Sequence, residues 1–180
     1  MKTDARVRYT RKVLREALFE CLKEKRLNEV SVKEVCDRAE LNRATFYKHY
    51  KDCYDMIEQL EQEELEEFRE LLQTKDKFGK DLTYAILNML DRNADLTEAA
   101  VSGKITDSFK NHMLEAAHEF CIEDWKRMMP KGTEQDVEMM FSASMAAAFH
   151  LFINERGRYD KESVVNFIHN IINAGIRMFS

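Results

Sequence analysis

Hydrophobic residues recur every three or four positions along most of this chain of 180 residues, the spacing that places them on one side of an α-helix. Between about residues 10 and 25 they predict an amphipathic first helix, whose buried positions are Leu14, Ala17, Leu18, Cys21 and Leu22. Residues 1–9 carry Lys2, Arg6 and Arg8 and little to bury, so we expect them to form a mobile arm.

A second helix is expected to open at Ser31, because Glu34 lies three residues further on and completes a capping box. Its buried positions are Val32, Val35, Cys36 and Ala39. Residues 40–42 then form a short turn into a third helix. Two helices joined by a three-residue turn predict a helix-turn-helix.

The third helix is expected over residues 42–50, with Asn42 as its N-cap. Phe46 and Tyr50 fall one turn apart on the side that is buried. The opposite side carries Ala44, Thr45 and Lys48, flanked by Tyr47 and His49. This donor-rich, cationic outer face suits the major groove of duplex DNA.

A fourth helix is expected from Asp52 or Cys53 to about residue 72, and its apolar positions alternate with acidic ones. The acidic positions are Glu58, Glu61, Glu63, Glu64, Glu66, Glu67 and Glu70. Paired carboxylates can serve acid catalysis, but no histidine or nucleophile shares their spacing. We therefore predict a solvated helix face that links two domains. Residues 74–80 are expected to form a loop.

Five further helices complete the prediction of an all-α fold with about nine helices. They are expected near residues 82–90, 96–102, 107–130, 134–156 and 161–179, with Gly103 ending the sixth and Gly157 separating the last two. Small residues flatten one side of the eighth helix, and the ninth is apolar around more than one stripe. Such a terminal helix usually has two neighbours.

Composition agrees with a helical, cytoplasmic protein. The chain has one Pro and five Gly, and no apolar run approaches the roughly 18 residues that a membrane span needs. No signal-peptide core follows the N-terminus. The four cysteines form no C-x-x-C pair and are expected to be reduced and mostly buried. His118 and Cys121 alone are too few for a metal site, so no metal or cofactor is expected.

Charge is divided unevenly along the chain. Residues 1–53 hold 14 Lys and Arg against 9 Asp and Glu, a net of +5, whereas the remainder holds 14 against 24, a net of −10. A basic N-terminal part on an acidic body is typical of a protein that binds DNA through one domain.

Residues 31–50, Ser-Val-Lys-Glu-Val-Cys-Asp-Arg-Ala-Glu-Leu-Asn-Arg-Ala-Thr-Phe-Tyr-Lys-His-Tyr, resemble the signature of TetR-family transcriptional regulators. The best matches are Thr45-Phe46-Tyr47, His49 and Tyr50, and the resemblance covers roughly residues 10–60. It implies a DNA-binding domain in residues 1–53 and a helical regulatory and dimerisation domain in residues 54–180.

Two positions depart from the family pattern. Glu40 stands where the family usually has Gly, which costs about 1 kcal/mol if the backbone there is left-handed. Cys53 stands where the family tends to have a Lys that contacts phosphate, and Lys51 can take its place.

Nine residues are assigned to the palindromic duplex DNA. Ala44, Thr45 and Lys48 are predicted at base edges, and Arg43 at bases or phosphate. The predicted backbone contacts are Ser31, Lys33, Tyr47, His49 and Lys51.

The expected function is a homodimeric transcriptional regulator, a repressor, controlled by a small hydrophobic effector. The resemblance implies a dimer through the last two helices, with Ala147, Leu151, Ile168 and Ile172 as candidates. Candidates for the effector pocket are Tyr84, Met89, Phe109, His112, Met113, Phe120, Trp125 and His150. The alternative is control by a protein partner that docks on the C-terminal domain. An enzyme is disfavoured, because the sequence has no catalytic motif such as G-x-S-x-G or H-E-x-x-H.

Overall fold

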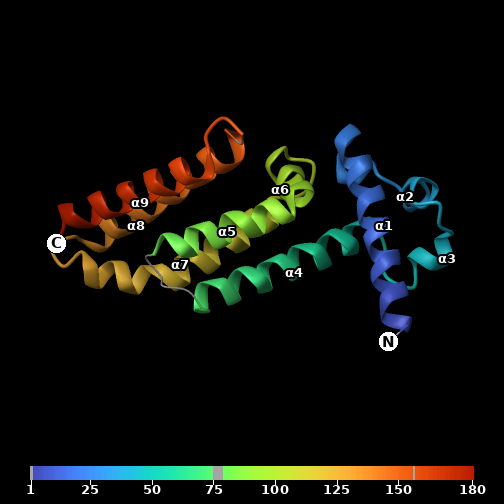
Figure 1. Cartoon of the computed structure of the whole chain (residues 1–180), viewed down its shortest axis with the longest axis horizontal. Helices are drawn as coiled ribbons and strands as arrows, with labels where there is room; N and C mark the ends of the chain where they lie inside the picture. Colours follow the sequence, from blue (N-terminus) through green and yellow to red (C-terminus); the bar gives the residue numbers. More distant parts are fainter. Residues whose placement is uncertain (1, 75–78, 156) are drawn as a thin grey trace. The chain divides into compact units, whose positions relative to one another are not determined.

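The computed structural model describes residues 2–74, 79–155 and 157–180. Within these ranges the chain has no strand and nine α-helices, as the sequence predicted (Figure 1). The α-helices are α1 Lys2–Glu24, α2 Val32–Arg38, α3 Arg43–Phe46, α4 Cys53–Thr74, α5 Lys80–Arg92, α6 Ala94–Val101, α7 Ser108–Met128, α8 Glu134–Phe149 and α9 Lys161–Met178. A 3₁₀ turn covers Leu27–Glu29, and a π-helical turn covers His150–Asn154.

The chain forms two compact units. Unit 1 comprises Met1–Glu64 and Asp95–Asp107, and unit 2 comprises Leu65–Ala94 and Ser108–Ser180. Helix α4 contributes residues to both units. The predicted domain boundary between residues 53 and 54 stays a prediction.

The core of unit 1 is built from the predicted buried sides of its helices. All five predicted positions of α1, from Leu14 to Leu22, are buried. Val35 and Cys36 of α2 and its C-cap Ala39 are buried as well, whereas the fourth predicted position, Val32, is half-buried. The backbone N–H of Leu27 donates to the carbonyl of Lys104 at 2.9 Å, which ties the segment after α1 to the segment after α6 within this unit.

The core of unit 2 gathers apolar side chains from α4, α5, α7, α8 and α9 around Trp125. Trp125 is 2% exposed, and its ring centroid lies 5.9 Å from that of Phe141 on α8. Helices α8 and α9 lie side by side (Figure 1) and approach closely at Gly175, where a Cβ atom would meet the side chain of Met140.

The predicted limits of the first and eighth helices were wrong. Residues 2–9 are not an arm but the first turns of α1, in which Thr10 Oγ1 donates to the Arg6 carbonyl at 2.9 Å. Lys, Arg and Ala are good helix formers, which favours this continuation. The eighth helix does not run unbroken to residue 156, since α8 ends at Phe149 and the π-helical turn follows.

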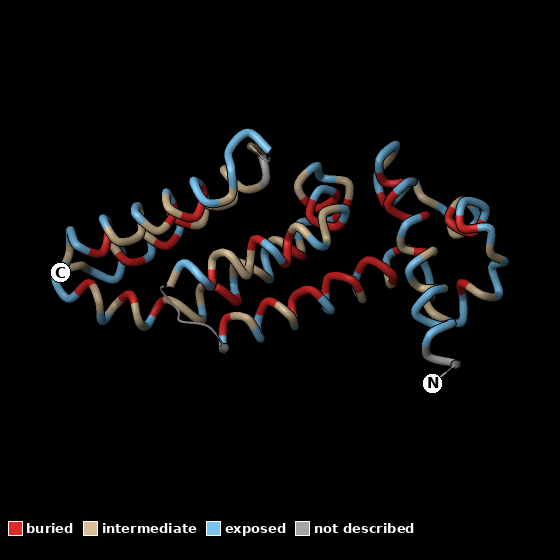
Figure 2. The backbone as a smooth tube through the Cα atoms, in the orientation of Figure 1, coloured by how far each residue is buried: buried red, intermediate tan, exposed pale blue. Residues whose placement is uncertain are grey.

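The prediction that the acidic side of α4 is solvated was only partly correct, because two of its glutamates are buried. Buried positions recur along one side of α4 (Figure 2), and they include Glu61 and Glu64, which are 8% and 6% exposed. Residues 75–78 of the predicted loop lie outside the described residues. No helix in the described part of the chain is long and apolar enough to cross a bilayer.

Candidate nucleic-acid interface

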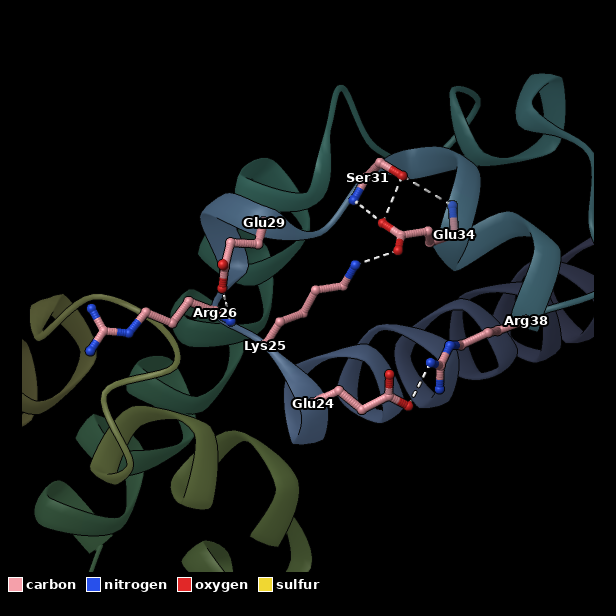
Figure 3. Close-up of polar contacts among 7 residues, drawn as sticks. All are labelled: Glu24, Lys25, Arg26, Glu29, Ser31, Glu34 and Arg38. Atoms are coloured by element: carbon pink, nitrogen blue, oxygen red, sulfur yellow. Dashed lines mark hydrogen bonds and ion pairs between the residues drawn. The ribbon is translucent and has the colours of Figure 1, made fainter.

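Helix α2 is fixed at its start by the predicted capping box (Figure 3). The backbone N–H of Glu34 donates to Ser31 Oγ at 3.3 Å, and the backbone N–H of Ser31 donates to Glu34 Oε2 at 3.0 Å. Lys25 Nζ also donates to Glu34 and links the end of α1 to α2. The Glu34 carboxylate accepts from Lys25 Nζ and from the backbone N–H and hydroxyl of Ser31. These hydrogen bonds lower the pKa of Glu34 to about 2, with the Lys25 contact as the largest cause.

A second ion pair joins α2 to α1. Arg38 Nη2 donates to Glu24 Oε1 at 2.7 Å (Figure 3), and this hydrogen bond raises the pKa of Arg38. Helix α2 is therefore held on α1 at both of its ends.

The turn after α2 has a left-handed backbone at Glu40, the case in which the sequence analysis expects an energetic cost. Glu40 has φ = 53°, and the backbone N–H of Leu41 donates to the Cys36 carbonyl at 3.0 Å. This is the pattern of a helix that ends through a left-handed residue.

The third helix is shorter than predicted. Only Arg43–Phe46 is α-helical, and residues 47–49 continue as tight turns with the N–H groups of Lys48 and His49 donating to the Thr45 and Phe46 carbonyls. Asn42 caps it as expected, because Asn42 Oδ1 accepts from the Thr45 N–H at 2.8 Å. We call residues 43–49 the recognition segment.

Two aromatic side chains hold the recognition segment on unit 1. Phe46 is 0% exposed and Tyr50 is 3% exposed, and their ring centroids lie 5.7 Å apart. The edge of the Tyr47 ring meets Phe46, yet Tyr47 remains 57% exposed. The buried side of the segment is thus as predicted, and its outer side is accessible.

The structure brings the predicted DNA contacts together in unit 1. Exposed positions are Ser31, Lys33, Arg43, Ala44, Tyr47, Lys48 and Lys51, whereas Thr45 and His49 are half-buried. No carboxylate in the described part of the chain forms an ion pair with Arg43, Lys48 or Lys51. Their charges remain available for an anionic partner.

Thr45 is already engaged within the segment. Its hydroxyl donates to Asn42 Oδ1 at 3.0 Å, so towards DNA the oxygen can only accept a hydrogen bond. Amino groups of adenine or cytosine offer such a donor in the major groove.

The sequence analysis missed Arg11, whose guanidinium contacts Tyr50, the residue directly after the recognition segment. Arg11 Nε donates to Tyr50 Oη at 3.1 Å, and this bond is the main cause of the raised pKa of Arg11. A signal was present, because Arg11 precedes Leu14 by three residues and so shares the buried side of α1.

The predicted effector residues lie in unit 2 and are only partly turned inward. Met89, Phe109 and Trp125 are buried, and Tyr84, Met113 and Phe120 are half-buried. His112 and His150 are exposed, so they do not line an enclosed pocket in this structure. A surface cavity of about 150 Å³ lies in unit 1, and its lining contains none of these residues.

The four predicted dimer residues differ in exposure within the single chain. Ile168 is 5% exposed in the single chain, so it packs mainly against its own chain, and its place in the dimer contact stays a prediction. Ala147, Leu151 and Ile172 are half-buried. Exposed apolar side chains lie nearby on α8 and α9, namely Met139, Ala143, Ala146, Phe167, Ala174 and Met178.

The sequence matches no protein-family model and no curated protein sequence. Among solved structures, the chain is similar to the dihydroxyacetone kinase operon activator DhaS. The TM-score is 0.59 and the identity 18%, over 95% of this chain and 98% of DhaS. At this identity the likeness shows the shared all-α fold alone.

Proposed function

We propose that the protein is a dimeric, sequence-specific DNA-binding regulator of transcription. The observation that carries the proposal is the recognition segment. It is anchored by Phe46 and Tyr50 and presents Arg43 and Lys48 to solvent without an ion-pair partner in the described chain. A capped, cationic helix start with an accessible outer side fits the major groove.

The likeness to DhaS supports this function as well. That protein is named as the activator of an operon, and the shared fold covers almost the full length of both chains. We propose repression for this chain, since a dimer bound over a promoter blocks transcription. Expression of a reporter gene placed behind the selected operator distinguishes repression from activation.

Selection from a random duplex pool tests the DNA-binding proposal. We expect the wild-type protein to recover one sequence. Lys48→Ala should then lower discrimination between that sequence and random DNA by about tenfold, because a base contact is worth about 1–3 kcal/mol. Lys51→Ala should weaken the affinity for the selected sequence and for random DNA by the same factor, because a phosphate contact does not depend on sequence.

Lys131→Ala is the matched control. It removes the same charge from an exposed position in unit 2, whereas the recognition segment belongs to unit 1, and should change neither the specific nor the random-DNA affinity. Recovery of no preferred sequence by the wild-type protein contradicts the proposal.

The dimer is proposed through the exposed apolar sides of α8 and α9. On α8, Met139, Ala143 and Ala146 share one side, and on α9 Phe167 and Met178 are 51% and 77% exposed. None of these side chains carries a charge, so a second copy can cover them without burying an ion.

Control by a small apolar effector in unit 2 is the second part of the proposal. Trp125 Nε1 and Ser144 Oγ are buried, and neither atom has a hydrogen-bond partner within the described residues. Buried polar groups normally have a partner, so these atoms favour a ligand with a hydrogen-bond acceptor. We propose that such a ligand binds the state with low DNA affinity and shifts α4, which contributes to both units.

Trp125 fluorescence tests this control, because Trp125 is the only tryptophan. A panel of apolar carbonyl and phenolic compounds should contain one that changes both the fluorescence and the affinity for the selected duplex. If no compound changes either, control by a docking protein partner becomes the better proposal.

A further inference from the structure

Arg11 on α1 holds three elements of unit 1 together. Its Nε donates to Tyr50 Oη at 3.1 Å, and its Nη2 donates to Gln59 Oε1 at 3.3 Å and to Glu63 Oε1 at 2.8 Å on α4. The guanidinium carbon lies 5.7 Å from the centre of the Tyr50 ring. One half-buried side chain therefore touches the residue directly after the recognition segment and two successive turns of α4.

The contacts continue along α4 and return to the chain directly after the recognition segment. Gln59 Nε2 donates to Asp55 Oδ2 at 3.1 Å, and the same oxygen accepts from the backbone N–H of Lys51 at 2.8 Å. This series of contacts thus starts at Tyr50, passes through α1 and α4, and ends at Lys51. Both chain positions that follow the recognition segment are fixed by it.

An arginine is needed at this position for a physical reason. Its planar guanidinium presents several donors in fixed directions, whereas a lysine ammonium is a compact charge on a flexible stem. A lysine at position 11 keeps the charge but cannot donate to Tyr50 and the two α4 side chains from separate nitrogens held in fixed directions. Gln59 and Glu63 lie one helical turn apart, so a displacement of α4 alters both contacts at once.

We propose that Arg11 is the positioning residue of the recognition segment, through which the position of α4 sets the position of Tyr50. The consequence for DNA rests on the proposed function, but the structural part can be measured without DNA. When α4 moves relative to α1, the guanidinium changes partners and the hydroxyl of buried Tyr50 loses its donor. The recognition segment then loosens at its C-terminal end.

Hydrogen exchange of the full-length protein tests this role. Arg11→Lys keeps the charge, and Tyr50→Phe keeps the buried ring but removes the acceptor. In both variants we expect the amides of residues 47–50, which are hydrogen-bonded in the structure, to exchange about tenfold faster. Lys12→Gln is the matched control, because it removes a charge from the exposed side of the same turn and should leave these amides unchanged.

A second measurement uses the duplex selected by the wild-type protein. Arg11→Lys should lower the ratio of specific to random affinity by about tenfold. Lys12→Gln should leave this ratio as in the wild type. If the selection recovers no sequence, the DNA-binding proposal fails while the exchange result still decides the role of Arg11.

Three outcomes overturn the inference. The first is wild-type exchange of residues 47–50 in Arg11→Lys, and the second is wild-type exchange there in Tyr50→Phe. The third is an equal acceleration in peptides of both units, which indicates global destabilisation rather than loss of a local restraint.

Discussion

Glu40 is the only non-glycine residue with a positive φ in the described ranges, at 53°. A side chain in this conformation costs about 1 kcal/mol, and glycine removes the cost. We expect Glu40→Gly to raise the free energy of unfolding by about 0.5–1 kcal/mol, measured by urea denaturation. Glu40→Ala is the control, because it removes the charge but keeps the Cβ atom. Equal gains in both variants indicate that charge, not backbone strain, is responsible.

Glu34 makes the stability of the protein depend on pH. Its pKa is about 2 in the folded protein and 4.5 without these contacts. The carboxylate therefore stabilises the fold fully above pH 4.5, and this contribution is lost as the pH falls towards 2. We expect Glu34→Gln to be less stable than the wild type at neutral pH and to lose less stability on acidification. Melting temperatures of both proteins across this range measure the difference, and parallel curves contradict it.

Gly175 sets how closely α8 and α9 approach each other. A Cβ atom at this position lies 1.8 Å from Met140 Cε and 2.7 Å from Met140 Sδ. We expect Gly175→Ala to destabilise the protein by about 1 kcal/mol, because Met140 must leave its place in the unit 2 core. In a Met140→Ala background the same change should stabilise by about 1 kcal/mol through helix propensity alone. Destabilisation of similar size in both backgrounds means that Met140 is not the obstacle.

The helices of the chain were largely predictable, because their signals are local. The capping box at Ser31, the left-handed Gly103 and Gly157, and the buried sides of α1 and α2 each depend on residues a few positions apart. The start of α1 was missed because the short basic segment of residues 1–9 has too few apolar residues, among them Val7 and Tyr9, to show a helical periodicity. The early end of α3 was missed because the spacing of Phe46 and Tyr50 is the same in a helix and in successive tight turns.

The exposed residues of the recognition segment were predictable from the sequence, but the contacts of Arg11 that fix the chain after the segment were not. Helical spacing over a few residues is enough to show which side chains of the segment face solvent. Arg11 meets Tyr50, Gln59 and Glu63 across 39, 48 and 52 positions of the chain. Partners at such distances depend on tertiary packing, and periodicity carries no information about them. The burial of Ile168 was not predictable for the same reason, because only the fold shows which of two apolar stripes of α9 faces the core.

At the scale of the whole molecule, the exposed apolar sides of α8 and α9 predict a dimer. Light scattering of the wild-type protein should give twice the chain mass of 21.3 kDa. Phe167→Glu should give the mass of one chain with an unchanged melting temperature, because Phe167 is 51% exposed in the single chain. Asn111→Glu places the same charge on an exposed position of α7 and should remain a dimer. A wild-type monomer at micromolar concentration contradicts the prediction.

A twofold dimer imposes its symmetry on the DNA it binds. Two recognition segments related by a twofold axis contact two half-sites about one helical turn, roughly 34 Å, apart, so the selected operator should be a palindrome. Inserting about 5 bp between the half-sites turns them to opposite sides of the duplex, so only one segment can bind its half-site. The affinity of the wild-type protein should then fall to that of a single half-site, while monomeric Phe167→Glu should bind both duplexes equally weakly. A wild-type protein that binds the two duplexes equally well does not engage both half-sites as one rigid dimer.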